Sequence, residues 1–253
     1  IFTTTLWEYP SQHYDAYIDA EGALKRTTIT RAGLTGRQTP GGMQGDKAYV
    51  GATPSWVIWQ LLMRYTRPGD VVLDPMCGSG TTIDVCRDLG REPRGFDLAP
   101  SRPDIAPADA RRLPLPDASV DFAFVDPPYS THVDYSDDPR CIGKLDSGGP
   151  DRGVAYYEAM ARVIAEMHRA LRPRRYMGLY VSDSFKKAGA GRKNDFMPIG
   201  FELFALMREK FQPVDIISVV RHNQKLQRGN WRKAAEEGNF FLRGFNYLFI
   251  MKK

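Results

Sequence analysis

Two short stretches of this chain carry residues whose types and spacing could do chemistry. The first is Val71–Thr82, VVLDPMCGSGTT, and the second is Phe122–Tyr129, FAFVDPPY. Each is an apolar, β-rich run that stops at an aspartate and then turns sharply. Buried parallel strands deliver functional groups to the carboxyl edge of a sheet in this way. We therefore expect Asp74 and Asp126 to end two strands beside one site.

The first stretch has the features of a ligand-binding turn. Gly78 and Gly80 flank one small residue, so the backbone N–H groups can approach a ligand that a Cβ atom would push away. The residues from Thr81 onward begin a helix, whose N-terminus carries partial positive charge. The third glycine of a dinucleotide fingerprint and the Gly-Lys-Ser/Thr of a P-loop are both missing. The turn by itself leaves its ligand open.

The second stretch predicts a rigid clamp. Pro127 and Pro128 fix φ and remove two backbone donors, which leaves the carbonyl oxygen of Pro127 unpaired and holds Asp126 and Tyr129 in a fixed relation. Two acceptors beside an aromatic ring suit a planar group that bears an NH2. A strand-ending turn without chemistry is the alternative interpretation of this stretch alone.

In this order, the two motifs resemble those of the S-adenosylmethionine-dependent amino-methyltransferases, which methylate exocyclic amines of adenine or cytosine in DNA. The resemblance is close from Gly45 to Tyr129. It implies a Rossmann-like methyltransferase fold of the α/β class, with a mostly parallel, doubly wound sheet and a C-terminal antiparallel β-hairpin. It also implies S-adenosyl-L-methionine as the cofactor and direct in-line transfer to a flipped or unpaired base, without a metal or a covalent intermediate.

The cofactor and catalytic residues follow from spacing and from this resemblance. Asp97 ends the next expected strand about 20 residues after the glycine turn, where an acid can bind both ribose hydroxyls. The resemblance adds Thr53 and Pro54, and Asp109 as the acceptor of the adenine amine. The expected catalytic residues are Asp126, Pro127, Pro128 and Tyr129. The expected cofactor-binding residues are Thr53, Pro54, Asp74, Pro75, Cys77, Gly78, Ser79, Gly80, Thr81, Thr82, Asp97, Leu98, Asp109 and Ala110.

Some alternatives are excluded and others stay open. Methylation at a cytosine carbon needs a thiolate, usually after a proline, and no proline precedes Cys77, Cys86 or Cys141. Asp rather than Ser before the two prolines favours adenine N6 over cytosine N4. An RNA amino-methyltransferase, a protein glutamine methyltransferase and a catalytically silent cofactor- or nucleic-acid-binding subunit remain alternatives.

Length and composition set the remaining bounds. A chain of 253 residues and 28.6 kDa accommodates one catalytic domain over 1–253, with 1–47 as an N-terminal arm or covering loop. It has no run of eighteen apolar residues and no secretory signal pattern at its start, so we expect a cytoplasmic protein without membrane contact. Three cysteines without metal-ligand spacing favour a reducing compartment and no metal.

The charge is concentrated toward the C-terminus. Residues 171–253 contain 17 Lys and Arg against 7 Asp and Glu, whereas the first 170 contain 18 against 23. This basic third predicts a DNA-binding surface, with a solvated face as the alternative. The candidate substrate-contacting loops are 131–152, 186–194 and 222–238. The expected nucleic-acid-binding residues are Lys186, Lys187, Arg192, Lys193, Lys225, Arg228, Trp231, Arg232 and Lys233.

These loops are short for the recognition of a long DNA site. We therefore expect a short or degenerate site, a single-stranded substrate, or a second chain or homodimer that supplies recognition, in a restriction-modification setting.

Periodicity places the elements around the two motifs. Helices are expected over 55–65, with Thr53 or Ser55 at the cap, over 156–171 and over 201–211. Further strands are expected over 94–97, 176–181, 214–220 and 245–251, the last two forming the closing hairpin.

Overall fold

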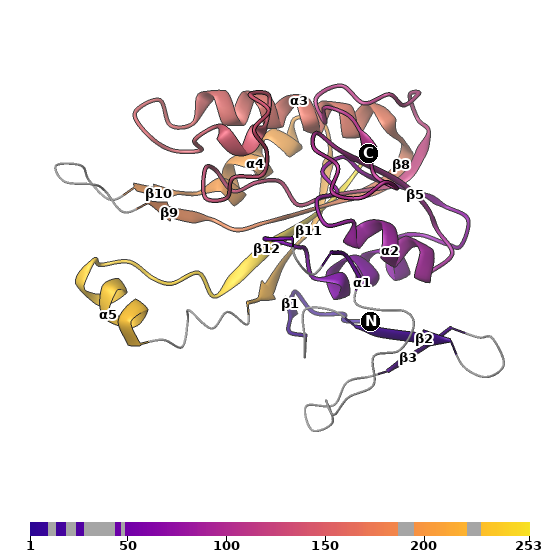
Figure 1. Ribbon diagram of the computed structural model, residues 1–253, viewed down its shortest axis with the longest axis horizontal. Helices are drawn as coiled ribbons and strands as arrows, with labels where there is room; N and C mark the ends of the chain where they lie inside the picture. The colour runs from indigo at the N-terminus through magenta and orange to yellow at the C-terminus, as the bar shows by residue number, and fades with distance from the viewer. Residues whose placement is uncertain (10–13, 19–23, 28–43, 47–48, 187–194, 222–228) are drawn as a thin grey trace.

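The computed structural model describes residues 1–9, 14–18, 24–27, 44–46, 49–186, 195–221 and 229–253. They form an α/β structure whose central eight-stranded sheet has the order β1-β11-β12-β8-β7-β4-β5-β6 (Figure 1). The strands of this sheet are β1 Leu6–Trp7, β4 Val71–Asp74, β5 Glu92–Asp97, β6 Ala106–Pro107, β7 Val120–Val125, β8 Leu171–Val181, β11 Gln212–Val220 and β12 Phe245–Lys252.

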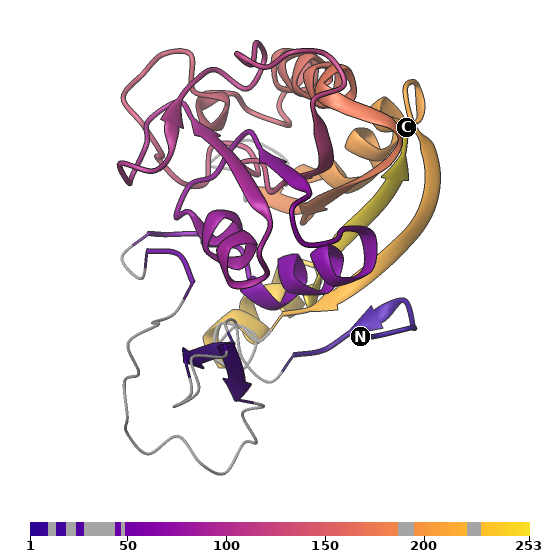
Figure 2. The same ribbon diagram turned by 90° about the vertical axis from the view of Figure 1, so that its right-hand side faces the viewer.

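The directions of the strands confirm the expected sheet. Strands β6, β5, β4, β7 and β8 run parallel, and β12 is antiparallel to both β8 and β11. Strands β11 and β12 form a long, curved hairpin toward one edge of the sheet (Figure 2). Because β11 runs parallel to β8, the carboxyl ends of β4, β5, β7, β8 and β11 all lie at the same edge, where Asp74 and Asp126 are found.

Helices cover both faces of the sheet (Figure 1). Helices α1 Ser55–Tyr65 and α2 Thr81–Asp88 lie on one face, and α3 Val154–Ala170 and α4 Ile199–Arg208 lie on the other. Strand β7 shows why: Phe122 and Phe124 pack with the α1 side, whereas Ala123 and Val125 pack with the α3 side. Alternate side chains point to opposite faces of a strand, so a central strand with both faces covered is apolar throughout.

The junction of α3 and β8 differs from the expected bounds. The helix ends at Ala170 and the strand begins directly at Leu171, five residues before the expected start at Tyr176. Pro173 explains the early end, because proline cannot continue a helix and restricts the residue before it to extended backbone. Helix α4 likewise begins at Ile199 and ends at Arg208, two to three residues earlier than expected.

Two elements at the carboxyl edge were not expected. A hairpin of β9 Ser184–Lys186 and β10 Asp195–Met197, and a helix α5 Gly229–Glu237, extend from the same side of the molecule (Figure 1). The segment that follows α5 contacts the hairpin through the stacked rings of Phe240 and Phe185, whose centroids lie 4.4 Å apart. The candidate substrate-contacting loops 186–194 and 222–238 thus contain regular structure at their described ends, with Lys186 in β9 and residues 229–237 in α5.

The N-terminal arm docks on the sheet as a strand. Leu6 and Trp7 pair in parallel with Ser218 and Val219 of β11, and the Trp7 side chain is buried. Tyr14 is also buried, and its hydroxyl donates to Asp88 Oδ2 at 2.8 Å. A separate hairpin, β2 Asp15–Ile18 and β3 Leu24–Thr27, follows. The remaining small element is the 3-10 helix η1, Ile142–Lys144.

Two kinds of feature are absent from the described residues. None of the helices within them is long and apolar enough to cross a membrane. The same residues contain no group of three or more His, Cys, Asp or Glu side chains that could hold a metal ion.

Candidate active site

The glycine turn lies between β4 and α2, where two left-handed residues redirect the chain. Gly78 and Gly80 have φ angles of 47° and 80°, a region that side chains disfavour. A Cβ atom on Gly78 would lie 3.0 Å from the ring of Tyr49, and one on Gly80 would lie 2.7 Å from the guanidinium of Arg102. The turn is therefore enclosed on both sides and requires glycine at both positions.

Asp74, at the end of β4, stabilises this turn through hydrogen bonds. Its carboxylate accepts hydrogen bonds from the Met76 N–H at 3.0 Å and from the Thr82 hydroxyl. Burial raises the pKa of Asp74 to about 7. Among the expected cofactor residues, five do not line the cavity described below and instead build the frame around it: Pro54, Asp74, Gly80, Thr81 and Thr82.

The chain before α1 closes over the outer side of the turn. The Gly45 N–H donates to Asp84 Oδ2 at 2.8 Å, and the Asp46 N–H donates to the Ser79 carbonyl at 2.9 Å. A Cβ atom on Gly45 would lie 2.4 Å from Thr81 Oγ1, so this segment fits closely against the start of α2. The described end of the N-terminal arm therefore packs against the glycine turn and the start of α2.

Two acidic residues from the next strand ends face the same space. Asp97 Oδ2 accepts the Gly78 N–H at 2.9 Å, which ties the end of β5 to the glycine turn. Asp109 is held by Arg111, whose Nε and Nη2 donate to it at 2.9 and 2.6 Å. This pairing lowers the pKa of Asp109 and keeps it ionised. Leu98 and Ala110, which follow the two acids, line the cavity with them.

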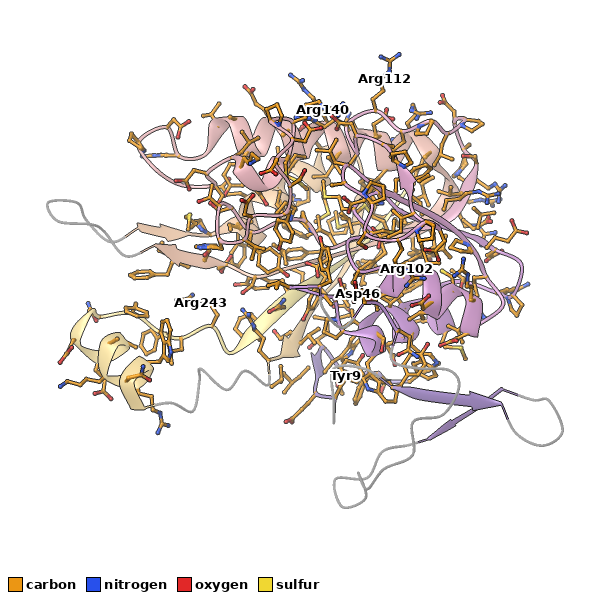
Figure 3. All side chains as sticks on the ribbon, in the orientation of Figure 1. Tyr9, Asp46, Arg102, Arg112, Arg140 and Arg243 are labelled. Atoms are coloured by element: carbon orange, nitrogen blue, oxygen red, sulfur yellow. The ribbon has the colours of Figure 1, made fainter. Side chains whose placement is uncertain are left out.

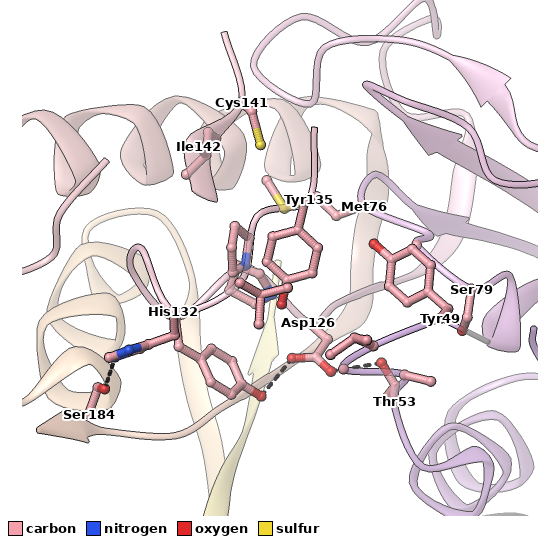
Figure 4. Close-up of a pocket in the computed structure, with 18 of the residues that line it drawn as sticks. Tyr49, Thr53, Met76, Ser79, Asp126, His132, Tyr135, Cys141, Ile142 and Ser184 are labelled. Carbon is pink, nitrogen blue, oxygen red and sulfur yellow. Dashed lines mark hydrogen bonds between the residues drawn. The ribbon is translucent and has the colours of Figure 1, made fainter. Parts of the chain in front are cut away.

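Asp126 is the most constrained group of the site. Its Oδ2 accepts from the Thr53 hydroxyl and its Oδ1 from the Tyr129 hydroxyl, each at 2.7 Å (Figure 4). The Tyr129 oxygen in turn accepts from Asn246 Nδ2 at 3.2 Å. Desolvation by burial raises the pKa of Asp126 to about 7, although both hydroxyl donors favour its ionised form.

This arrangement corrects the expected helix cap. The N-cap of α1 is Pro54, which makes no side-chain capping bond. Thr53 instead uses its hydroxyl on Asp126, while Ser55 Oγ accepts the Tyr14 N–H at 3.2 Å. Both polar side chains are recruited by tertiary contacts, and the packing of the apolar face of α1 remains to stabilise the helix.

The two prolines present their carbonyl groups differently. Tyr156 donates its hydroxyl to the Pro128 oxygen at 2.8 Å. Among the described residues, no donor reaches the Pro127 oxygen, as the sequence predicted. The clamp thus retains one free backbone acceptor beside the Asp126 carboxylate.

The glycine turn and the clamp open into one cavity of about 860 Å³. Tyr49 and Tyr135 stack across it with ring centroids 6.3 Å apart, and Met76, Cys141 and Ile142 add apolar surface (Figure 4). The cavity contains all four expected catalytic residues and nine of the expected cofactor-binding residues, namely Thr53, Pro75, Cys77, Gly78, Ser79, Asp97, Leu98, Asp109 and Ala110.

The far side of the cavity was not predicted. His132 Nε2 hydrogen-bonds to Ser184 Oγ and so joins the segment after the clamp to β9 (Figure 4). Arg221 follows β11 directly and lines the same wall. The strand-end rule that identified Asp126 also applies to Arg221, since β11 ends at the same edge of the sheet. Tyr49, Tyr135 and Asn246 carried no comparable signal in the sequence.

The expected nucleic-acid-binding residues fall into two groups. Trp231 lines the cavity, and Arg232 and Lys233 are exposed on α5. Lys186 ends β9. The other five, Lys187, Arg192, Lys193, Lys225 and Arg228, lie outside the described residues.

Comparison with known proteins agrees with this geometry. Residues 3–107 match the family model N6_N4_Mtase, described as DNA methylase. The chain is similar to this family over that part of its length. The matched residues include the glycine turn and Asp97, and they end before the clamp at Asp126.

Two curated proteins that are similar to part of this chain are type II methyltransferases. M.HinfI of Haemophilus influenzae is 32% identical over 79 residues, which cover 31% of this chain and 22% of the relative. M.Cfr9I of Citrobacter freundii is 41% identical over 59 residues, which cover 23% and 20% of the two chains. The matched part of the chain thus spans about a fifth of each relative.

Among solved structures, TrmN from Thermus thermophilus is similar in fold. Its TM-score is 0.50 with 18% identity, and the match covers 81% of this chain and 50% of TrmN. Together with the strand order, this likeness confirms a Rossmann-like methyltransferase fold for the chain.

Proposed function

We propose that this protein transfers a methyl group from S-adenosyl-L-methionine to the exocyclic amine of a base in DNA. The observation that carries the proposal is the shared cavity. Strands β4 and β7 are adjacent and parallel, so the glycine turn after Asp74 and the clamp at Asp126 open onto one space of about 860 Å³. A cofactor in the turn and an amine in the clamp would therefore lie next to each other.

The walls of the cavity fit the proposed cofactor. Its volume lies within the range of about 300 to 1,000 Å³ that small-molecule sites occupy. Gly78 offers backbone surface without a side chain, and Asp97 beside it would accept from two ribose hydroxyls. Asp109 would accept from an adenine amine with the lone pairs that Arg111 leaves free. When bound, S-adenosyl-L-methionine supplies a methyl group already activated by its sulfonium.

The clamp would prepare the amine for this methyl group. An exocyclic amine is a poor nucleophile because its lone pair is delocalised into the ring. Asp126 would accept one amine hydrogen and the Pro127 carbonyl the other, which directs the lone pair toward the methyl group. Both acceptors would also stabilise the positive charge that develops on the nitrogen. Thr53 and Tyr129 hold the carboxylate in place for this task, so its position is fixed before the substrate arrives.

The nucleic-acid part of the proposal rests on the cavity mouth and the charge. A base within a duplex cannot reach Asp126, so it must be flipped out or unpaired. Arg221 and Arg243 line the cavity, and Arg232 and Lys233 are exposed nearby on α5, where cations would neutralise phosphates. We propose adenine N6 as the preferred target over cytosine N4, and DNA over RNA.

Three features of the protein remain predictions. They are one catalytic domain over residues 1–253, a second chain or homodimer that supplies target recognition, and a cytoplasmic location.

The proposal is tested by following a labelled methyl group from the cofactor into nucleic acid. Unmethylated duplex DNA, heat-denatured DNA and RNA of mixed sequence are offered separately. We expect label in DNA, and we expect Asp126→Ala to abolish transfer while cofactor affinity, measured by calorimetry, stays near the wild-type value. Label that appears in RNA alone, or an Asp126→Ala variant with full activity, would contradict the proposal.

A further inference from the structure

The segment between α5 and β12 forms one wall of the cavity mouth. Residues 240–243, Phe-Phe-Leu-Arg, all line the cavity. The start of this segment is fixed to its helix, because the N–H groups of Gly238 and Phe240 donate to the carbonyl oxygens of Ala234 and Ala235, each at 3.0 Å. The Phe240 ring is fixed as well, since it stacks on Phe185 of β9 at 4.4 Å and an angle of 18°.

Arg243 fixes the other end of the segment. Its Nη2 donates to the Phe241 carbonyl oxygen at 2.7 Å, and its guanidinium lies over the ring of Phe196 in β10, 5.2 Å from the centroid. Figure 3 labels Arg243 at the base of this segment, between α5 and the β9–β10 hairpin. The backbone at Phe241 is thus held on both sides, by Phe240 before it and by Arg243 after it.

These contacts leave the Phe241 side chain exposed. Its side chain is 87% exposed, the highest value among the large apolar side chains that the structure describes. A single exposed apolar side chain is ordinary on a protein surface. Phe241 differs because it lies at the mouth of the cavity and because its neighbours hold its backbone in place while its ring stays in solvent. A rigid support of this kind favours contact with a partner over collapse onto the protein.

We propose that Phe241 enters the base stack of duplex DNA and fills the space that the target base leaves when it moves to Asp126. This inference rests on the proposed function and assigns a positioning residue to it. Every base has a π-face, so an aromatic ring can stack in the gap regardless of sequence. Trp231, which the sequence analysis placed among the nucleic-acid-binding residues, is less suited to this role, because it is only 37% exposed and forms part of the cavity wall.

The proposal separates duplex from single-stranded substrates. A base in a duplex must lose its stacking partners before it reaches the clamp, and a ring in the vacated gap offsets that cost. A base in denatured DNA has no such gap to fill. Phe241 should therefore matter for the duplex and matter little for denatured DNA, whereas Asp126 should matter for both.

The experiment compares kcat/KM for methyl transfer to duplex and heat-denatured DNA of the same mixed sequence. Base–aromatic stacking energies correspond to a loss of about 5-fold to 150-fold. We expect Phe241→Ala to lose activity in that range on the duplex and less than about 3-fold on denatured DNA, since the ring has no gap to fill there. Phe241→Trp should retain duplex activity, because indole stacks at least as well.

Controls separate this role from a loss of folding. Phe201→Ala removes a ring that is 58% exposed on α4 and does not line the cavity, and it should leave both activities unchanged. Cofactor affinity of Phe241→Ala should match the wild type. Equal losses on both substrates, no loss on either, or a Phe241→Trp variant as weak as Phe241→Ala would overturn the inference. A wild-type protein that methylates neither DNA would instead contradict the proposed function, and the inference with it.

Discussion

The hydrogen bond from Thr53 to Asp126 leads to a prediction about the pH dependence of methyl transfer. Thr53 Oγ1 donates to Asp126 Oδ2 at 2.7 Å, and burial raises the pKa of that carboxyl to about 7. The ionised carboxylate is the stronger acceptor and stabilises the positive charge that develops on the amine nitrogen, so activity should rise with pH around 7 in the wild type. A donor on the carboxylate favours the ionised form. Replacing Thr53 with valine removes this donor with little change in volume and should therefore move the rise to higher pH.

The expected size of the shift in the pH profile follows from the strength of hydrogen bonds to charged groups. A hydrogen bond to a charged group contributes about 1.5 to 3 kcal/mol, and 1.36 kcal/mol corresponds to one pH unit. The rise in activity should therefore move up by about one to two pH units. At pH 7 about half of the wild-type carboxylate is ionised, against about 1 to 10% in the variant, so the rate should fall about 5- to 50-fold there. Near pH 9 to 10 the difference should largely disappear.

The assay is single-turnover methyl transfer at saturating cofactor and DNA, from pH 6 to pH 10. Thr53→Ser retains the hydroxyl donor and serves as the matched control, with a profile near that of the wild type. The reasoning is refuted if the Thr53→Val profile coincides with the wild type, because the bond would then have no effect on protonation. It is also refuted if the rate falls by the same factor at every pH, which would indicate a loss of positioning alone.

Three further outcomes are expected. Gly80→Val should weaken cofactor binding at least about 10-fold, because the added Cβ atom would lie 2.7 Å from Arg102. Gly69→Val is the control, since Gly69 shares the left-handed φ but has open space around it, and it should leave cofactor affinity unchanged. Equal affinities of the two variants by calorimetry would contradict this prediction. Asp97→Ala should also weaken cofactor binding at least about 10-fold, since the carboxylate accepts the Gly78 N–H of the turn and would contact the ribose of the cofactor; unchanged affinity would exclude that role. Burial raises the pKa of Asp74 to about 7 in the folded protein, whereas the unfolded chain releases this proton near pH 4. The free energy of unfolding should therefore fall as the pH rises from about 4 to about 7. Asp74→Asn should reduce that fall in denaturant titrations, and an unchanged slope would show that Asp74 does not titrate this way.

The sequence predicted those helices and strands whose bounds are set by local sequence patterns. Helix α1 runs over Ser55–Tyr65 as its periodicity indicated, and β4 ends at Asp74 as expected. Strand β7 was recognisable because a parallel strand covered on both faces is mainly apolar, as residues 122–125 are. The start of β8 was missed because the basic, proline-containing stretch 172–175 is typical of a loop, whereas these residues lie in the strand, where Arg172 and Arg175 form ion pairs with Asp121.

The contacts that tune the site could not be predicted in this way. Thr53 is 73 residues from Asp126 in the sequence, and Asn246 is 117 residues from Tyr129. Pairings over such distances depend on how the strands assemble, which periodicity does not encode. Helix α5 was missed because it is short and mostly exposed, with Ala235 as its one buried residue in the described structure. The exposed Phe241 appeared in the sequence as one of several aromatic residues before β12.

The central claim is that the clamp directs a methyl group to an exocyclic amine. Unmethylated duplex DNA incubated with the protein and S-adenosyl-L-methionine, then digested to nucleosides and measured by mass spectrometry with chromatographic standards, tests this directly. We expect the wild-type protein to produce N6-methyladenine, or N4-methylcytosine if the preferred base is cytosine. We expect neither product with Asp126→Ala. Methylation at a ring carbon of cytosine, or N-methylated nucleosides that persist in Asp126→Ala, would contradict it.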